Sequence, residues 1–204
     1  MKGKLIVFEG PEGCGKTTKV KMAFDFLKRK NKKVVFLREP GGIKISEQIR
    51  KIILDTQNKN MCNITELFLY EAARAQLVHE KIKPLLEKGY IILMDRFYLA
   101  TVVYQGYGRG INRNIISYLN NLAVDGIKPD LTIIYDVSRK EAIKRMKNRK
   151  KKDRIEMENE RFHDRIRHGY LKEGKLIKAK IIMTDGKSVE EIFNVTKKIL
   201  LRVI

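Results

Sequence analysis

The chain has 204 residues and a mass of 23.8 kDa, which suits about one domain with a small insertion. Its 43% hydrophobic residues and its charge of +20, from 44 Lys and Arg against 24 Asp and Glu, exclude a collagen-like, mucin-like or disordered chain. Its apolar runs are far shorter than the roughly 20 residues of a membrane-spanning helix, and its first residues lack the apolar core and cleavage site of a signal peptide.

Five short apolar runs predict strands that are buried on both faces: residues 5–8, 34–37, 91–94, 131–135 and 181–183. Apolar residues at helical spacing predict helices at 20–27, 45–53, 64–89, 115–124, 142–146, 162–171 and 189–201. We expect Pro84 to bend or end the third helix. Strands that lie too far apart for hairpins pair in parallel, with helices on both faces of the sheet. The sequence therefore predicts one doubly wound α/β domain over residues 1–204, with a five-stranded parallel sheet.

The first predicted strand leads into a phosphate-binding motif. Residues 10–17 read GPEGCGKT, which fits G-x-x-x-x-G-K-[ST] between a strand and a helix. Backbone N–H groups and the helix N-terminus can surround a polyphosphate there, Lys16 can reach the β- and γ-phosphates, and Thr17 can bind Mg²⁺. This pattern predicts binding of ATP or GTP. The predicted nucleotide-binding residues are Gly10, Pro11, Glu12, Gly13, Cys14, Gly15, Lys16, Thr17 and Thr18.

Charged residues follow two other predicted strands. Asp95 and Arg96 come directly after the third strand, and Arg38 begins the loop after the second. Because ligands collect at the carboxyl ends of parallel strands, we expect these side chains to share a crevice with the P-loop. An Asp there can hold Mg²⁺ through water, and an Arg can bind a phosphate through two parallel hydrogen bonds. A surface ion pair is the alternative interpretation of Asp95 and Arg96.

An aromatic ring and an arginine share one face of the predicted helix over residues 64–89. Tyr70 and Arg74 are four residues apart, so their side chains are neighbours on that face. Together they can stack a base and bind its polar edge or its phosphate. Taken alone, the pair is better explained as a core tyrosine beside an arginine that reaches solvent.

Six segments together resemble the bacterial thymidylate kinases. They are residues 8–17, 38–42 (REPGG), 66–76 (from EL to RAQ), 95–106 (from DRF to YQG), 128–132 (KPDLT) and 153–156 (DRIE). They occur in the order of that family, from residue 5 to about residue 170. The resemblance implies transfer of the γ-phosphoryl group of ATP to dTMP, giving dTDP and ADP for dTTP synthesis, on a P-loop kinase fold and in a homodimer. Another pyrimidine nucleoside monophosphate kinase is the nearest alternative.

The same resemblance implies an acceptor site and a metal site. It puts Arg38, Arg74 and Arg96 around the dTMP phosphate, and it puts Tyr70 under the thymine ring with Gln105 at the base edge. The implied dTMP-binding residues are Glu9, Arg38, Tyr70, Arg74, Arg96, Thr101, Tyr104 and Gln105. The residues implied to lie by Mg²⁺ are Thr17, Glu9 and Asp95, and Glu9 is also implied to lie near the sugar hydroxyl.

Glu12 stands where some members of that family carry a catalytic arginine. An acid at this position resembles the form of the enzyme that supplies its arginine from a lid, and the basic segment at about 147–158 is the predicted lid, with Arg149 and Arg154 as its candidate arginines. A solvated basic loop is the alternative. The predicted catalytic residues are Lys16, Glu12, Asp95, Arg96, Arg149 and Arg154.

A second function class suits the charge of +20, because polycations gain affinity for nucleic acids by releasing counterions. The lysines are spread along the chain, however, and there is no zinc-finger spacing, RNP-type motif or repeat. We therefore expect no specific nucleic-acid partner and keep a nucleic-acid-stimulated ATPase as the less favoured alternative. The 2 cysteines have no CxxC spacing, so we expect reduced thiols in the cytoplasm and no metal bound through sulfur.

Overall fold

A five-stranded parallel sheet forms the centre of the computed structural model, which describes residues 3–147 and 152–204. The strands are β1 (Lys4–Glu9), β2 (Val34–Arg38), β3 (Ile91–Asp95), β4 (Leu131–Asp136) and β5 (Lys180–Met183). Their spatial order is β2-β3-β1-β4-β5, and every pairing is parallel. The chain thus builds on one side of β1 and then on the other, which opens a crevice at the carboxyl end of β1. The predicted doubly wound α/β fold is confirmed.

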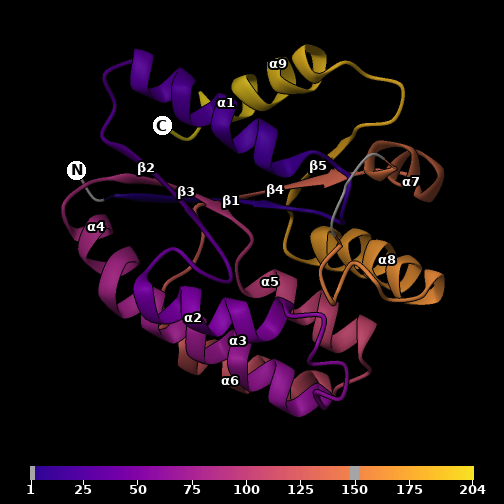
Figure 1. The fold of residues 1–204 in the computed structure, drawn as a ribbon. Coiled ribbons are helices and arrows are strands. Elements are labelled where there is room, and N and C mark those ends of the chain that lie inside the picture. The colour runs from indigo at the N-terminus through magenta and orange to yellow at the C-terminus, as the bar shows by residue number, and fades with distance from the viewer. Residues whose placement is uncertain (1–2, 148–151) are drawn as a thin grey trace.

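Helices cover both faces of this sheet (Figure 1). One face carries α1 (Lys16–Arg29) and α9 (Val189–Leu200), and the other carries α3 (Asn63–Leu77), α4 (Lys83–Glu87), α5 (Tyr98–Thr101) and α8 (Glu160–Leu176). Successive residues of β1 point to opposite faces. Ile6 and Phe8 pack in the core under α1 and α9, whereas Leu5 and Val7 pack in the core on the other side. Burial on both faces explains why the strands read as continuous apolar runs.

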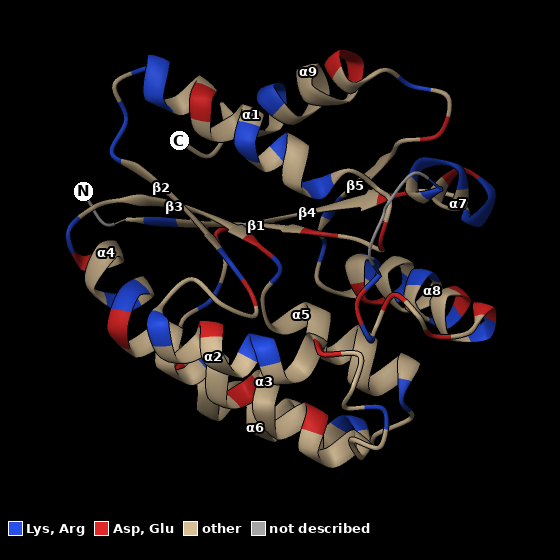
Figure 2. Cartoon of the chain, in the orientation of Figure 1, with Lys and Arg blue, Asp and Glu red and all other residues tan. Residues whose placement is uncertain are grey.

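The remaining helices flank these layers. They are α2 (Lys44–Leu54), α6 (Arg113–Val124), α7 (Arg139–Met146) and two π-helical turns, η1 (Val78–Ile82) and η2 (Val102–Gly108). Figure 2 shows Lys and Arg on helices throughout this arrangement rather than on one element. Of the part of the chain that the structure describes, no helix is long and apolar enough to cross a membrane.

The long helix predicted over residues 64–89 is continuous in space but not uniform. It runs from α3 through η1 into α4. Pro84 lies in the first turn of α4, where a missing N–H is tolerated. The helix is therefore irregular just before Pro84, where η1 forms a π-helical turn, and it continues beyond Pro84 as α4.

The sequence did not predict a helix between the Asp95-Arg96 pair and residue 115. The structure has α5 and η2 there, and Leu99 and Val103 pack against Ile166 and Tyr170 of α8. Polar side chains such as Thr101 are also buried on this helix. A helix that buries polar residues gives no clear apolar period, which explains the omission.

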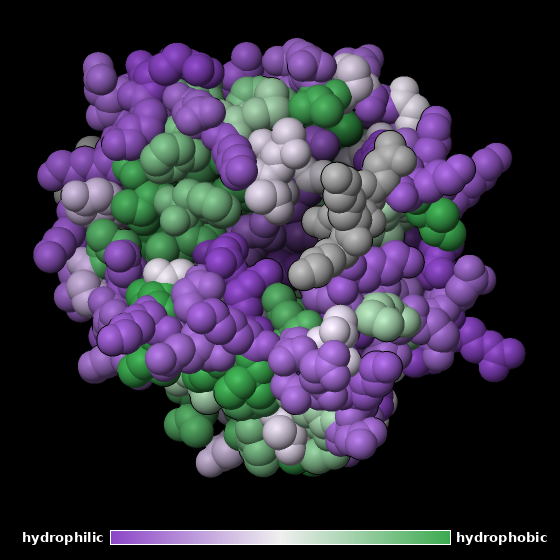
Figure 3. Space-filling model, viewed as in Figure 1, coloured by the Kyte–Doolittle hydropathy of each residue, from purple (hydrophilic) through white to green (hydrophobic). Residues whose placement is uncertain are grey.

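One helical face leaves large apolar side chains exposed. Ile64 and Phe68 of α3 lie one turn apart, and Ile115, Tyr118 and Leu122 line one face of the neighbouring α6. Leu122 is 69% exposed and Phe68 is 54% exposed. Hydrophobic residues gather along the lower edge of Figure 3, over these two helices. A contiguous apolar face of this kind marks an interaction surface.

Candidate active site

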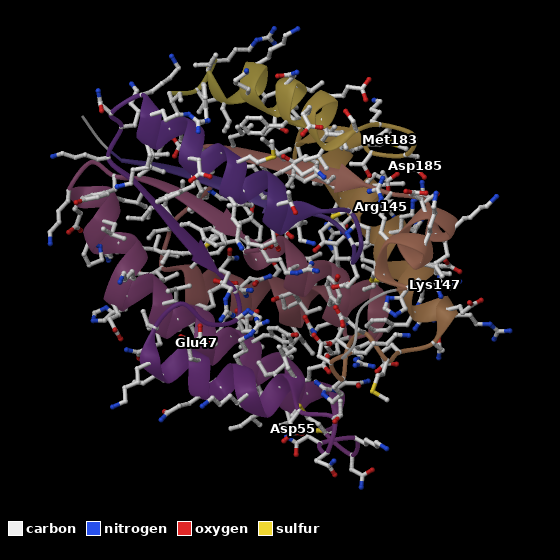
Figure 4. The ribbon with its side chains drawn as sticks, turned by 45° about the horizontal axis from the view of Figure 1, so that its top comes forward. Glu47, Asp55, Arg145, Lys147, Met183 and Asp185 are labelled. Atoms are coloured by element: carbon white, nitrogen blue, oxygen red, sulfur yellow. The ribbon has the colours of Figure 1, made fainter. Side chains whose placement is uncertain are left out.

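A cavity of about 1140 Å³ opens at the carboxyl ends of β1, β2 and β3. Its walls come from the loop between β1 and α1, from α2, α3 and α7, and from the segment from α5 to η2. In Figure 4, Glu47 of α2 and Arg145 of α7 lie on opposite sides of this region. The predicted residues that line it are Glu12, Gly13, Gly15, Lys16, Thr17, Thr18, Arg38, Tyr70, Arg74, Asp95, Arg96, Thr101, Tyr104 and Gln105. The cavity therefore brings together residues of the predicted nucleotide site and of the predicted acceptor site.

The P-loop between β1 and α1 requires its glycines. The φ angle of Gly10 is 136°, and a Cβ there would lie 2.2 Å from the Tyr135 carbonyl oxygen. Gly15 has a φ of 78° and directly precedes α1. Positive φ at these positions costs a side-chain-bearing residue strain that glycine does not feel. Gly10, Pro11 and Cys14 are the three predicted loop residues that lie outside the cavity lining.

Lys16 points back over this loop. Its Nζ donates to the carbonyl oxygens of Gly10, at 2.7 Å, and Pro11, at 3.2 Å. At the other side of the first turn, the Thr17 hydroxyl donates to Asp95 Oδ2 at 2.8 Å. A cation and a hydroxyl–carboxylate pair are therefore held at the N-terminus of α1, which itself favours negative charge.

The residues near the P-loop fit a magnesium ion better than a metal that needs a dense protein cage. Residues 3–147 and 152–204 contain no group of three or more His, Cys, Asp and Glu side chains that could hold a metal. Mg²⁺ typically keeps several waters and takes one or two carboxylates together with substrate phosphates. Thr17 and Asp95, already in contact, match that limited donor set.

Glu9 has a different environment from the one expected for a metal or sugar ligand. Its side chain is fully buried and is absent from the cavity lining. One carboxylate oxygen accepts from the Phe97 backbone N–H at 2.8 Å, and the other accepts from the Tyr170 hydroxyl at 2.9 Å. Burial raises the pKa of Glu9 to about 6, against the opposing effects of the Arg96 charge and the Phe97 hydrogen bond. Glu9 therefore lies beneath the cavity wall and fixes the Phe97 backbone and the Tyr170 side chain.

Arg96 sits at the centre of the wall in a strained backbone conformation, with a φ of 68°. Its guanidinium donates to Glu12 Oε1 at 2.6 Å and to the Tyr170 hydroxyl at 2.7 Å. It also lies 4.8 Å from the centroid of the Tyr104 ring, whose hydroxyl donates to Glu12. Burial opposes the ionisation of Glu12, but the charges of Arg96 and Lys16 outweigh it and hold the pKa of Glu12 below its usual range. Glu12 is thus the partner of Arg96, a pairing that the sequence did not reveal.

Arg74 is more deeply buried than the sequence suggested, with 1% of its surface exposed. It forms ion pairs with Glu39, at 2.7 Å, and with Glu71, at 2.8 Å. Its Nη2 also donates to the Thr101 hydroxyl at 3.0 Å. Two carboxylates already compensate its charge, so these surroundings favour a neutral polar group over a further anion. This differs from the expectation that Arg74 surrounds a phosphate.

Arg50 of α2 lines the cavity beside Arg38, and the sequence did not single it out. Both guanidiniums donate to the Pro40 carbonyl oxygen, at 2.8 Å from Arg50 and 3.1 Å from Arg38. Burial and the nearby charge of Arg38 lower the pKa of Arg50. Glu47, 2.9 Å from Arg38, offsets part of the repulsion between the two cations, and a further anion between them would relieve more of it. Among 44 basic residues, nothing in its spacing distinguishes Arg50.

Comparisons of the sequence and of the structure with known proteins all match thymidylate kinases. The thymidylate kinase family model matches residues 8–198. The chain is 43% identical over 200 residues to a thymidylate kinase of Caldanaerobacter subterraneus, covering 98% of this chain and 94% of that one, and 47% identical over 191 residues to one from Geotalea daltonii, covering 90% and 89%. A crystal structure of thymidylate kinase from Ehrlichia chaffeensis superposes with a TM-score of 0.80 at 28% identity, covering 98% of this chain and 99% of that one.

The chain belongs to the thymidylate kinase family. The family resemblance predicted from the six sequence segments is confirmed, as are the P-loop kinase fold and the class of enzyme, a dTMP kinase. The family uses ATP as its phosphoryl donor. The roles of individual residues remain predictions.

Arg145 is a second cavity residue that the sequence did not single out in this thymidylate kinase fold. It lies on α7, close to Asp185 in Figure 4. Its Nη1 lies 3.4 Å from the Gly13 carbonyl oxygen and donates to the Thr184 hydroxyl at 3.1 Å. Arg145 therefore joins the P-loop to the residue that follows β5.

The predicted thymidylate kinase lid is described only in part. Arg149 falls within residues 148–151 and so lies outside the described residues. Arg154 is buried: its Nε donates to the Ile53 carbonyl oxygen at 2.8 Å, and its Nη2 lies 2.6 Å from Glu66 Oε2. Arg154 is also absent from the cavity lining, which in the described part of the lid comprises Lys152, Asp153, Ile155 and Glu156.

Glu39 gives the site a measurable pH dependence of stability. Burial raises its pKa to about 7 from an ordinary 4.5, although the charge of Arg74 opposes this. The folded state therefore keeps a proton that the unfolded chain releases between about pH 4.5 and 7, so stability falls as the pH rises through this window, by up to about 1.4 kcal/mol per pH unit for one proton. We expect Glu39→Gln to reduce this slope in urea-unfolding measurements at pH 5, 6 and 7, most clearly between pH 6 and 7, because Glu9 also holds a proton up to about pH 6.

The matched control for that measurement is Glu47→Gln. The pKa of Glu47 is lowered: its hydrogen bond from the Gly42 N–H and the charge of Arg38 outweigh burial. Its contribution to stability is lost only as the pH falls below about 4.5, outside the measured window. If Glu39→Gln keeps the wild-type slope between pH 5 and 7, Glu39 is not the group that holds the proton.

Proposed function

We propose that this chain transfers the γ-phosphoryl group of ATP to dTMP, giving dTDP and ADP for dTTP synthesis, in the cytoplasm. The observation that carries the proposal is the shared cavity: Lys16 and Thr17 line the same space as Arg38, Tyr70 and Gln105. Phosphoryl transfer needs donor and acceptor phosphates held in line at short range, with little covalent chemistry from the protein. One cavity with a P-loop on one side and a base site on the other meets that need.

On the donor side, the P-loop N–H groups surround the triphosphate. Lys16 exchanges its bonds to Gly10 and Pro11 for β- and γ-phosphate oxygens. Thr17 and Asp95 would hold Mg²⁺, which would supply positive charge beside the transferring group. Arg145 lies beside the nucleotide where it joins Gly13 to Thr184.

On the acceptor side, Arg38, Arg50 and Arg96 hold the dTMP phosphate. The Arg38 and Arg50 pair supports this, because the two cations share one carbonyl oxygen. Tyr70 stacks under the thymine ring and Gln105 meets the base edge. The compensated charge of Arg74 suits the base edge as well, next to Thr101.

The attacking oxygen needs no dedicated base. A phosphate monoester is already ionised near neutral pH, so the acceptor residues need only align it. A lid arginine, Arg149 or Arg154, adds positive charge when the lid, residues 147–158, closes over the substrates. Closure also excludes water that would otherwise hydrolyse ATP. Arg154 would have to leave Glu66 to do so.

The partner of this chain is a second copy of itself, bound through α3 and α6. The support is the exposed apolar face of Ile64, Phe68, Ile115, Tyr118 and Leu122. We expect Phe68→Glu to weaken self-association by at least about 30-fold, because a buried aromatic at the centre of an interface contributes about 2 kcal/mol or more. Light scattering over a dilution series measures this.

The matched control for the dimer is Ile143→Glu, which places the same charge at an exposed residue of α7, away from that face. It should leave the molar mass unchanged. A wild-type chain that is monomeric at all concentrations, or a Phe68→Glu variant that dimerises as tightly as the wild type, would contradict the proposed interface.

The proposed reaction is tested with ATP labelled in its γ-phosphate. Label should appear in dTDP when dTMP is offered, and thymidine should be no acceptor because it cannot occupy the arginine site. Transfer to CMP or UMP in preference to dTMP would support another pyrimidine monophosphate kinase. Transfer to thymidine would show that the arginines do not select a phosphorylated acceptor.

A further inference from the structure

Glu66 of α3 is a buried carboxylate that the reaction described above does not use. It is 1% exposed and lies outside the cavity lining. Gln105 Nε2 donates to its Oε1 at 2.9 Å. Arg109 donates to both of its oxygens, with Nε and Nη2 each at 3.0 Å, and Arg154 Nη2 lies 2.6 Å from its Oε2. Three side chains from other segments thus converge on one carboxylate directly behind a residue of the base site.

The charge of Glu66 fixes which way the Gln105 amide turns. Burial opposes ionisation, but the hydrogen bonds from Arg109 and Gln105 and the charges of Arg109 and Arg154 hold the pKa of Glu66 below its usual range. An ionised carboxylate accepts hydrogen bonds and cannot donate one. The amide can therefore offer Glu66 only its NH₂ group, and its carbonyl oxygen must turn the other way. The alternative flip would set that oxygen against a buried negative charge.

The orientation of a terminal amide decides which pyrimidine it accepts. Thymine and uracil carry a donor at N3, between two carbonyl groups, whereas cytosine carries an acceptor at N3 beside an amino group. A carbonyl oxygen facing N3 accepts the proton of thymine but opposes the lone pair of cytosine. A site that fixes one hydrogen-bonding polarity discriminates strongly against the wrong partner, because a mismatch leaves polar groups unpaired.

We propose that Glu66 is a positioning residue for base selection: by holding the NH₂ group of Gln105, it keeps the Gln105 carbonyl oxygen toward the base and so favours 4-oxo pyrimidines over cytosine. This inference rests on the proposed placement of Gln105 at the base edge. Arg109 contacts Glu66 from the side away from the base and keeps it charged and fixed, and Arg154 adds to this for as long as it stays paired with Glu66. Arg109 is itself paired with Glu158 and lies over the Phe162 ring, 4.7 Å from its centroid.

The test is the ratio of kcat/KM for dTMP to kcat/KM for dCMP in Glu66→Gln. A glutamine at position 66 can accept or donate, so Gln105 can flip, and we expect the ratio to fall by roughly 10- to 100-fold, the worth of one or two neutral hydrogen bonds. Because both substrates are measured on one preparation, partial unfolding cancels from the ratio. Glu66→Asp, which keeps the charge but withdraws it by one methylene from Gln105, should lower the ratio in the same direction and provides the test if Glu66→Gln does not fold.

Two further variants separate positioning from general damage. Arg109→Lys keeps the Glu66 carboxylate charged and bonded to Gln105, so it should lower the melting temperature yet leave the ratio within about 2-fold. The exchange variant Glu66→Gln with Gln105→Glu reverses the donor and acceptor of the pair and again presents an oxygen to N3, so it should recover much of the preference for dTMP. Failure of this rescue, with a ratio as low as in Glu66→Gln alone, would count against the proposal.

Gln105→Leu distinguishes failure of this inference from failure of the base placement on which it rests. If Gln105→Leu lowers the ratio and Glu66→Gln leaves it unchanged, Gln105 reads the base without help from Glu66 and the inference is overturned. If neither variant changes the ratio, Gln105 does not meet the base edge, and that part of the proposed function fails together with the inference.

Discussion

Lys16→Ala should lower kcat/KM for transfer to dTMP by roughly 10²- to 10³-fold, the usual loss when one preorganised group that stabilises transition-state charge is removed. Lys16 is the lysine of the P-loop, and its Nζ lies within 3.2 Å of two loop carbonyl oxygens at the mouth of α1. Those contacts hold the ammonium group at the proposed site of the β- and γ-phosphates. The loss should fall mainly on kcat, because charge on the transferring group builds up in the transition state.

The control for Lys16→Ala is Lys28→Ala, at the far end of the same helix. Lys28 lies in the last turn of α1 and is exposed, with its Nζ 5.7 Å from the Phe24 ring centroid. The Lys28→Ala variant removes the same charge from the same helix and should change kcat/KM less than 2-fold. Steady-state measurements of dTDP formation compare the two. A Lys16→Ala enzyme with more than a third of wild-type activity would contradict the proposed role.

Arg74→Met should destabilise the fold by about 3 to 5 kcal/mol, the typical cost of removing one partner from a buried ion pair. Arg74 is 1% exposed and compensates two carboxylates, Glu39 and Glu71. Without it, the two acids must either carry charge in the interior with no countercharge or take up protons, and both cost stability. Urea unfolding of the wild type and of the variant measures the difference in the free energy of unfolding.

The carboxylates provide the control for Arg74. If the cost comes from uncompensated charge, adding Glu39→Gln and Glu71→Gln to Arg74→Met should recover more than half of the lost stability. If it comes from lost packing instead, the triple variant should be no more stable than Arg74→Met alone. A single variant that loses less than about 1 kcal/mol would show that the pair is not buried as the structure has it.

The sequence predicted best those elements whose residues share one property, such as apolarity, or follow a fixed spacing. The strands β1, β3 and β4 are buried on both faces, so they appear as unbroken apolar runs such as residues 5–8 and 91–94. The P-loop was equally clear, because its glycines and Lys16 stand at fixed spacing between a strand and a helix. Together these features predicted a ligand-binding crevice at the carboxyl ends of the strands.

Partnerships between distant segments could not be predicted in this way. Glu12 pairs with Arg96, Arg154 with Glu66, and Arg50 shares a carbonyl oxygen with Arg38. Such contacts depend on how the loops fold against one another, and the charge of a residue does not reveal which of many opposite charges it meets. The segment of α5 and η2 was missed for a related reason, since its polar residues are buried and interrupt its apolar pattern.

The most direct test of the whole account measures ADP and dTDP in parallel, with Mg-ATP and dTMP as substrates and with single-stranded DNA added or omitted. Transfer to a small acceptor predicts one dTDP for each ADP, little ADP without dTMP, and no stimulation by DNA. ADP that forms without dTDP, and that increases with added DNA in a salt-dependent manner, would contradict it and indicate a nucleic-acid-stimulated ATPase.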